Sequence, residues 1–154
     1  MIADNKKMVV ITLIAIFFIT LDRWFKAVAI NVLADRSWTI TSWLQLHLDY
    51  NPNIAFSLPL GGLLLNVIIA LLILILVRGY LNYKKSQRYL EAGWTLVVVF
   101  GALSNFFDRL RYGAVIDYIS IPFFTVFNLA DALICCGLLG LLYSEWRRSK
   151  KLVV

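Results

Sequence analysis

Polar side chains that could do chemistry stand at the ends of long apolar segments instead of being spread along the chain. Asp22 and Lys26 lie at i and i+4, so a helix would place them on one face, where they can pair. Asn128 and Asp131 are three residues apart and would also share a face. A third helical stripe consists of Gly101, Asn105 and Asp108, with Arg109 beside it. Ionisable groups among apolar residues are unfavourable to bury, so their clustering indicates a functional site.

Two of the carboxyls suggest a reaction. Asp131 has no cation four residues away, so its most favourable partner is another carboxyl with which it shares a proton. Asp117 is the candidate, because it lies fourteen residues earlier across a loop-to-helix connection. Two carboxyls about 3 Å apart cannot both ionise, so one stays protonated and the other remains a base. Such a pair can activate water while donating a hydrogen bond to a carbonyl, which is the chemistry of an aspartic hydrolase.

Other hydrolytic mechanisms lack the residues they need. No serine or cysteine has a basic partner, no glycine-rich phosphate loop occurs, and no His, Cys and Glu cluster has zinc-ligand spacing. Cys135 and Cys136 are adjacent, so a helix would point them about 100° apart as small apolar fillers. His47 is a lone histidine. We therefore expect metal-free hydrolysis without a cofactor.

The composition predicts that a membrane surrounds these residues. Of 154 residues, 61% are hydrophobic and only 16% charged, and the mean hydropathy is +0.79. Soluble domains are roughly 45–50% apolar and ~25% charged. We predict an all-α membrane protein in which residues 1–154 form a single domain. Four segments read as spans: Met8–Leu21, continuing to or past the interface, Leu58–Val77, Ala92–Phe107 and Val126–Tyr143.

The basic residues indicate how the spans are oriented. Ten of the fifteen lysines and arginines lie near both termini and in the loop around Tyr83–Tyr89, which predicts that these parts face the cytoplasm. We therefore attribute the net charge of +6 to the orientation of the protein in the membrane and not to nucleic-acid binding. A cleaved signal peptide is the alternative for the first span, but polar residues at helical spacing follow it and no small-residue cleavage site precedes a soluble domain.

The long outer connection, Asp35–Ser57, contains a predicted strand. Residues Trp43–Tyr50 alternate between apolar and polar side chains, which is the period of a half-buried strand. We expect a small outer β segment between the first and second helices, resting on the membrane. Trp38 and Trp43 would anchor it at the depth of the lipid headgroups.

Five short motifs resemble those of the lipoprotein signal peptidases, or signal peptidase II, a family of four-span bacterial membrane aspartic peptidases. In chain order they are Asp22 with Lys26; Asn51 with Ala55 and Phe56; Gly101, Asn105, Asp108 and Arg109; Gly113, Val115 and Asp117; and Phe127, Asn128, Ala130 and Asp131. The chain departs from the family pattern at five residues, one of which is Ala132, where serine is frequent. Asn53 and Ile54 replace glycine and alanine, Ser104 replaces glycine, and Tyr118 replaces phenylalanine.

The resemblance implies cleavage of lipid-modified prolipoproteins just before the diacylglyceryl cysteine, at the outer surface of the bacterial cytoplasmic membrane. It implies that Asp117 and Asp131 are the catalytic dyad. The groups expected to position the substrate are Asn51, Asn105, Arg109 and Asn128, and those expected to support the site are Asp22, Lys26, Gly101 and Asp108. The partners would be the prolipoprotein and membrane lipids, with no nucleic acid.

Two other functions remain open at this point. A catalytically inactive membrane binding protein could keep the same scaffold, and the departures at Asn53 and Ile54 favour it. A proton-coupled transporter could use the carboxyls, but Asn66 is the only polar side chain deep in residues Leu63–Leu76. The sequence therefore favours the peptidase.

Overall fold

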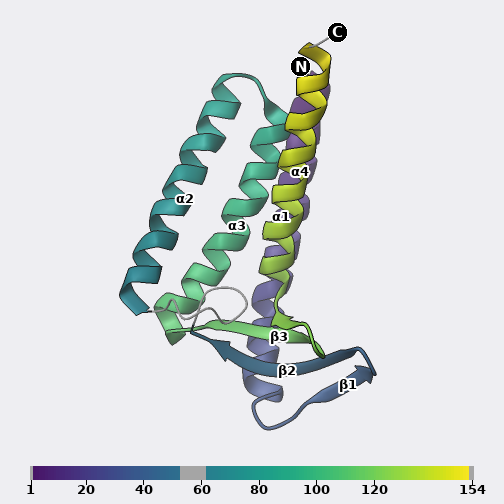
Figure 1. The fold of residues 1–154 in the computed structure, drawn as a ribbon, viewed down its shortest axis with the longest axis vertical. Helices are drawn as coiled ribbons and strands as arrows, with labels where there is room; N and C mark the ends of the chain where they lie inside the picture. Colours follow the sequence, from purple (N-terminus) through teal and green to yellow (C-terminus); the bar gives the residue numbers. More distant parts are fainter. Residues whose placement is uncertain (1, 53–61, 153–154) are drawn as a thin grey trace.

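The computed structural model describes residues 2–52 and 62–152, which form four long helices with a small sheet at one end (Figure 1). The helices are α1 Ile2–Val32, α2 Gly62–Lys85, α3 Tyr89–Tyr112 and α4 Leu129–Leu152. Each of them contains a stretch that is long and apolar enough to cross a membrane. The predicted fold class, four helical spans with a small β segment, is therefore confirmed.

The ends of the helices differ in places from the predicted spans. Helix α1 continues beyond Leu21, as predicted for the first span; it runs without interruption through Lys26 to Val32, and its polar residues Asp22 and Lys26 pair inside the bundle. The predicted start of the fourth span at Val126 is wrong, since that residue belongs to a strand and α4 begins at Leu129. The first residues of the predicted second span, 58–61, lie outside the described part of the chain.

The sheet combines two segments that are far apart in the sequence. Strands β1 Trp38–Thr41 and β2 Leu44–Asn51 follow α1, whereas β3 Val115–Ile121 and β4 Thr125–Phe127 connect α3 to α4. All neighbours are antiparallel, in the order β1-β2-β3-β4. The strand predicted over Trp43–Tyr50 is confirmed as β2, but β3 and β4 escaped prediction. Strand β3 is largely buried on both faces, so it lacks the apolar–polar alternation that indicates a strand.

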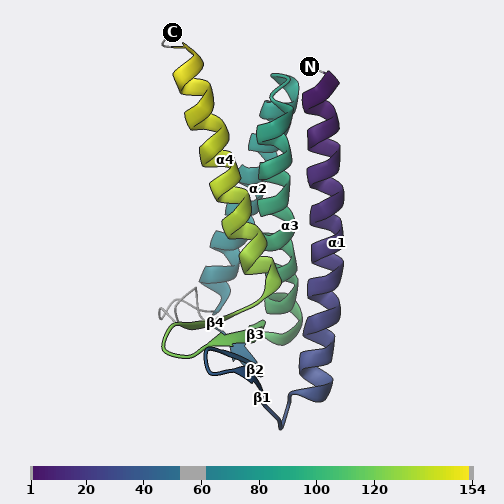
Figure 2. The ribbon, with the colours of Figure 1, turned by 90° about the vertical axis from the view of Figure 1, so that its right-hand side faces the viewer.

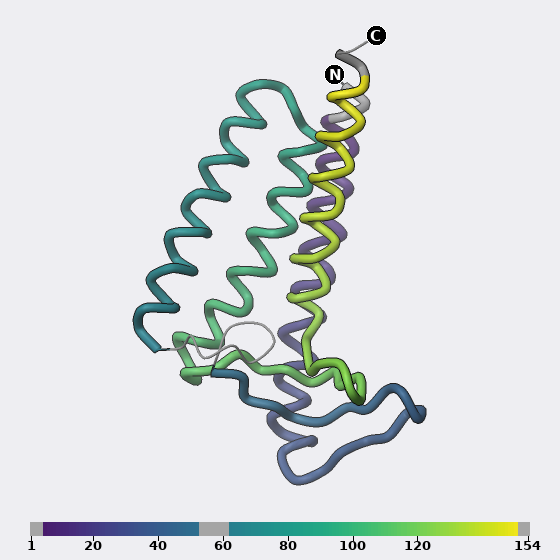
Figure 3. The backbone as a smooth tube through the Cα atoms, viewed as in Figure 1, coloured from purple at the N-terminus to yellow at the C-terminus, as the bar shows by residue number. Residues whose placement is uncertain are grey.

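Helix α3 lies at the centre of the bundle and packs against the other three helices (Figures 2 and 3). The outward faces of the bundle carry exposed apolar side chains, among them Phe17, Leu63 and Leu139, as lipid contact requires. The sheet crosses the end of the bundle opposite the two chain termini (Figure 1). Groups at the sheet end are therefore far from the basic α2–α3 turn.

Glycines let α4 approach α3 closely. A Cβ on Gly140 would lie 2.3 Å from the Trp94 ring, and one on Gly137 would lie 2.6 Å from Val98 Cγ2. A Cβ on Gly101 would lie 2.7 Å from the carbonyl oxygen of Ala130, in the first turn of α4. Small residues allow this kind of close contact between membrane helices. The contact at Gly101 fixes where α4 begins relative to α3.

Candidate active site

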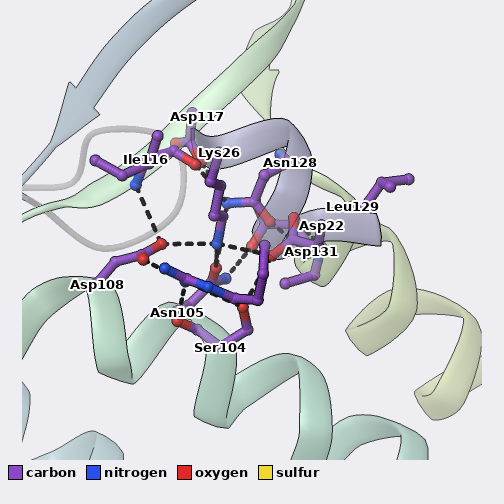
Figure 4. A network of polar contacts seen from close by, with 12 residues as sticks. Asp22, Lys26, Ser104, Asn105, Asp108, Ile116, Asp117, Asn128, Leu129 and Asp131 are labelled. Carbon is purple, nitrogen blue, oxygen red and sulfur yellow. Dashed lines mark hydrogen bonds and ion pairs between the residues drawn. The ribbon is translucent and has the colours of Figure 1, made fainter. Parts of the chain in front are cut away.

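The polar residues singled out in the sequence meet where α1, α3 and α4 reach the sheet (Figure 4). Helix α1 contributes Asp22 and Lys26, α3 contributes Asn105, Asp108 and Arg109, and the rest come from β2, β3 and the start of α4. Most of these side chains are fully enclosed. The exposed fraction is at most 1% for Asp22, Lys26, Asp108, Asp117 and Asn128. The convergence of these groups at one end of the bundle agrees with the prediction.

Two carboxylates and two cations form a cluster of zero net charge, in which Asp22, Lys26 and Asp108 are buried and Arg23 is partly exposed. Lys26 Nζ lies 2.7 Å from Asp108 Oδ2 and 3.1 Å from Asp22 Oδ2, so the predicted pairing of Lys26 with Asp22 is confirmed. Arg23 NH1 lies 2.5 Å from the second oxygen of Asp108. Buried charges are tolerated only when paired and hydrogen-bonded, and this cluster satisfies both conditions.

The cluster orients the amide of Asn105. Lys26 Nζ donates a 2.8 Å hydrogen bond to Asn105 Oδ1, which also accepts one from Asn128 Nδ2 at 3.2 Å. Because a lysine ammonium can only donate, the amide oxygen of Asn105 must face Lys26 and its nitrogen must face away. Asn105 Nδ2 then donates to Asp131 Oδ1 at 2.7 Å. A cation on α1 thus sets a hydrogen bond to a carboxyl on α4.

Asn128 and Asp131 cap the start of α4. Asn128 Oδ1 accepts a 2.9 Å bond from the backbone N–H of Asp131, and Asp131 Oδ2 accepts a 3.2 Å bond from the backbone N–H of Asn128. This reciprocal arrangement is a capping box, and it explains why the helix begins at Leu129. Asn128 also connects Asp131 to Asp117, because its Nδ2 donates a 2.6 Å hydrogen bond to Asp117 Oδ1.

Asp117 lies on β3, buried at the end of the bundle. Its second oxygen accepts a 3.3 Å hydrogen bond from Asn51 Nδ2 on the neighbouring strand. Burial raises the pKa of Asp117 to about 7, and the negative charge of Asp131 adds to the rise, while the amide bonds from Asn51 and Asn128 lower it. Asp117 therefore keeps its proton up to about neutral pH, as one member of a carboxyl pair must.

Arg109 lies at the edge of the site, next to the connection that follows β2. Its NH1 donates a 3.1 Å hydrogen bond to the carbonyl oxygen of Pro52, and its side chain is mostly buried. The departures from the family pattern at Asn53 and Ile54 come directly after this contact and lie outside the described residues, as do Ala55 and Phe56.

Three residues of the network escaped prediction from the sequence. Arg23 binds Asp108 across helices, and the Ser104 and Tyr118 hydroxyls both donate to Asp22. Local sequence spacing cannot predict these contacts, because each joins residues more than 80 positions apart. Within residues 2–52 and 62–152, no three His, Cys, Asp or Glu side chains are placed to hold a metal ion.

Comparisons with known proteins identify the family to which the chain is similar. The model of the family described as Signal peptidase (SPase) II matches residues 14–147. The chain is 36% identical over 130 residues to the lipoprotein signal peptidase of Syntrophomonas wolfei, covering 75% of this chain and 87% of that protein. It is 31% identical over 146 residues to the lipoprotein signal peptidase of Clostridium novyi, covering 90% and 98% of the two chains.

The fold has a counterpart among solved structures. A structure described as a bacterial membrane enzyme superimposes with a TM-score of 0.78 at 20% identity, over 92% of this chain and 90% of that one. This similarity concerns the fold, whereas the family match covers the segments that carry every residue of the buried network. The chain belongs to the signal peptidase II family of aspartic endopeptidases.

Proposed function

We propose that Asp117 and Asp131 form the dyad with which this multi-pass membrane peptidase releases signal peptides from lipid-modified prolipoproteins. The family and the names of its curated relatives support the reaction and the substrate class. The observation that carries the assignment of residues is the bond pattern of Asn128. Its side-chain nitrogen binds Asp117, and its side-chain oxygen and backbone N–H hold Asp131.

The geometry supports a two-carboxyl mechanism. One aspartate is ionised and takes a proton from water as the water oxygen attacks the scissile carbonyl carbon. The other aspartate is protonated and donates to the carbonyl oxygen, so a gem-diol forms. The two exchange roles when the gem-diol collapses, with the proton passing to the leaving amine. Because coupled carboxyls titrate as a pair, both steps belong to the dyad and not to one residue.

The asparagines and Arg109 are proposed to position the substrate as well as the dyad. The side-chain nitrogens of Asn51 and Asn105 each carry two N–H groups, and one from each binds an aspartate. The second N–H of Asn105 is proposed to bind a substrate carbonyl, and Asn51 is proposed to position the substrate beside Asp117. Arg109, held by the Pro52 carbonyl, is proposed to meet the polar part of the lipid-modified cysteine. Asp22, Lys26, Gly101 and Asp108 are proposed to support the site, and membrane lipids surround the spans.

A direct assay tests the function. Purified protein in detergent is incubated with a prolipoprotein carrying diacylglyceryl cysteine, and mass spectrometry follows the loss of the signal peptide. We expect cleavage that survives metal chelators, serine-directed reagents and thiol alkylation. Binding of the substrate without cleavage would instead favour the inactive binding protein. Loss of activity on chelation that added metal restores would overturn the aspartic mechanism.

The pH dependence of cleavage should follow the dyad. Because the pKa of Asp117 is raised to about 7, the pair holds one proton below that pH and loses it above. Without the proton no acid remains to bind the carbonyl oxygen. We therefore expect kcat/KM to fall about tenfold per pH unit above roughly pH 7 to 8. The measurement is kcat/KM from pH 5 to 9, and constant activity up to pH 9 would contradict the assignment.

We further propose that both termini are cytoplasmic and that the site faces the outer surface. The termini and the sheet lie at opposite ends of the bundle, and the basic residues favour this orientation (Figure 1). Single cysteines at Ser37 and Ser86, with Cys135 and Cys136 replaced by alanine, test it on intact cells. A membrane-impermeant thiol reagent should label position 37 and spare position 86. The reverse pattern would place the site on the inner side and contradict the proposal.

A further inference from the structure

Asp22 binds the chain neighbours of the site residues. Its Oδ2 accepts a 2.8 Å hydrogen bond from the Ser104 hydroxyl, and its Oδ1 accepts bonds from the Tyr118 hydroxyl at 3.1 Å and the Ala130 N–H at 3.2 Å. These three donors directly adjoin Asn105, Asp117 and Asp131, respectively. One buried carboxylate on α1 therefore connects α3, β3 and α4 at the points where each element carries a site residue.

Tyr118 adds a second connection between β3 and α4. Its hydroxyl oxygen accepts a 3.2 Å hydrogen bond from the backbone N–H of Leu129, the first residue of α4. The ring stacks on Phe25 and belongs to a buried cluster with Ile116, so its position is fixed by packing. The hydroxyl thus links the strand that carries Asp117 to the helix that carries Asp131.

The hydroxyls of Ser104 and Tyr118 also bear on which partners the three N–H groups of Lys26 bind. These N–H groups reach Asp108, Asp22 and Asn105, and the contact with Asp22 is the longest of the three. Asp22 tolerates this long contact because two hydroxyls and a backbone N–H complete its hydrogen bonds. A buried carboxylate that lacked the hydroxyls would draw the ammonium toward itself, since it has no other means of replacing lost hydration.

We propose that Ser104 and Tyr118 are positioning residues that act together through Asp22. By satisfying that carboxylate they hold Lys26 on Asn105, which directs the Asn105 amide at Asp131 (Figure 4). Both positions depart from the family pattern described above, in which glycine and phenylalanine supply no hydroxyl. The two departures meet on the same carboxylate, so in this chain they form one unit. The inference rests on the proposed role of Asp131 in the dyad.

The test is a set of double-mutant cycles on the purified full chain. Ser104→Ala and Tyr118→Phe should each lower kcat about tenfold and leave KM within about twofold, because all proposed substrate contacts except that of Asn105 persist while the dyad is misplaced. Asn105→Ala should lower kcat further, to a level that remains measurable. In the Asn105→Ala background, neither hydroxyl variant should change kcat by more than about twofold, since the group through which they act is gone.

Ser144→Ala and Tyr143→Phe serve as matched controls. Ser144 is a buried serine whose hydroxyl donates to the Gly140 carbonyl of its own helix, and Tyr143 is exposed; both lie toward the other end of α4. These variants should keep wild-type kcat. A lowered Tm with unchanged kcat in Ser104→Ala and Tyr118→Phe, or effects that multiply fully with Asn105→Ala, would overturn the inference. Absence of cleavage by the wild-type protein would instead refute the proposed function.

Discussion

Replacing either Asp117 or Asp131 with asparagine is expected to lower prolipoprotein cleavage by at least about 1000-fold while the protein stays folded. An amide cannot take the proton from water, and it cannot share a proton with the remaining carboxyl. Asparagine has nearly the same shape, and its oxygen can still accept the bond from Asn128 or Asn105. The measurement is initial cleavage rate per folded protein, with folding followed by gel filtration in detergent and thermal unfolding.

Asp35→Asn is the matched control for this pair, because it makes the same chemical change at an exposed carboxyl just after α1. It should retain at least half of the wild-type rate. Turnover within tenfold of wild type by either Asp117→Asn or Asp131→Asn would remove that residue from the dyad.

The same asparagine variant at position 117 should change how stability depends on pH. The pKa of Asp117 is raised to about 7 in the folded protein and is about 3.8 when the group is exposed, so the folded state holds this proton more tightly. This carboxyl therefore lowers the stability of the wild type as pH rises from about 4 to about 7. Between pH 5 and 8, the Tm of Asp117→Asn should rise relative to the wild type. A difference in Tm that is constant with pH would contradict the raised pKa.

Gly101→Ala is expected to lower kcat about 100-fold although it changes no polar side chain. The added Cβ would lie 2.7 Å from both the Ala130 carbonyl oxygen and Ile134 Cγ1. The first turn of α4 must move away from α3, and Asp131 moves with it. A displacement of about 1 Å at a reacting group can reduce the rate by about 100-fold.

Gly79→Ala is the control for this substitution, because its Cβ would meet no atom within 4 Å. It should keep wild-type kcat and an equal or higher Tm, since alanine favours a helix. Wild-type kcat in Gly101→Ala would show that the close approach of α3 and α4 is not needed for catalysis.

Sequence reasoning succeeded where contacts are local or where a motif has a fixed spacing. The pairing of Asp22 with Lys26 follows from one helical turn, and the four spans follow from the length of the apolar segments. The capping box of Asn128 and Asp131 also has a local signature, because the two residues are three positions apart. From the sequence, this spacing was used only to predict that both lie on one face of a helix. The start of α4 was misplaced because the strand residues before Asn128 are as apolar as a membrane helix.

Contacts that depend on how helices pack could not be predicted. The ion pair of Arg23 with Asp108 on α3 could not be predicted, because in the sequence Arg23 looks like any basic residue at a membrane interface. Strand β3 shows no alternation because helices cover one of its faces and other residues of the site lie against the other. The hydrogen bonds of Ser104 and Tyr118 to Asp22 form only where α3, β3 and α1 meet. The sequence of one segment alone cannot predict them.

The capping box at the start of α4 has a consequence for the order in which the enzyme is assembled. With Asp117 and Asp131 as the dyad, one carboxyl precedes Asn128 in the chain and the other lies in the helix that Asn128 begins. Synthesis proceeds from the N-terminus, so α1, α2 and α3 are made before α4. A chain at that stage holds Asp117 without its partner, so the pair cannot supply a base for water and an acid for the carbonyl oxygen at the same time. The peptidase therefore stays inert until α4 packs against Gly101, and a newly made copy cannot cut its neighbours in the membrane while it is still folding.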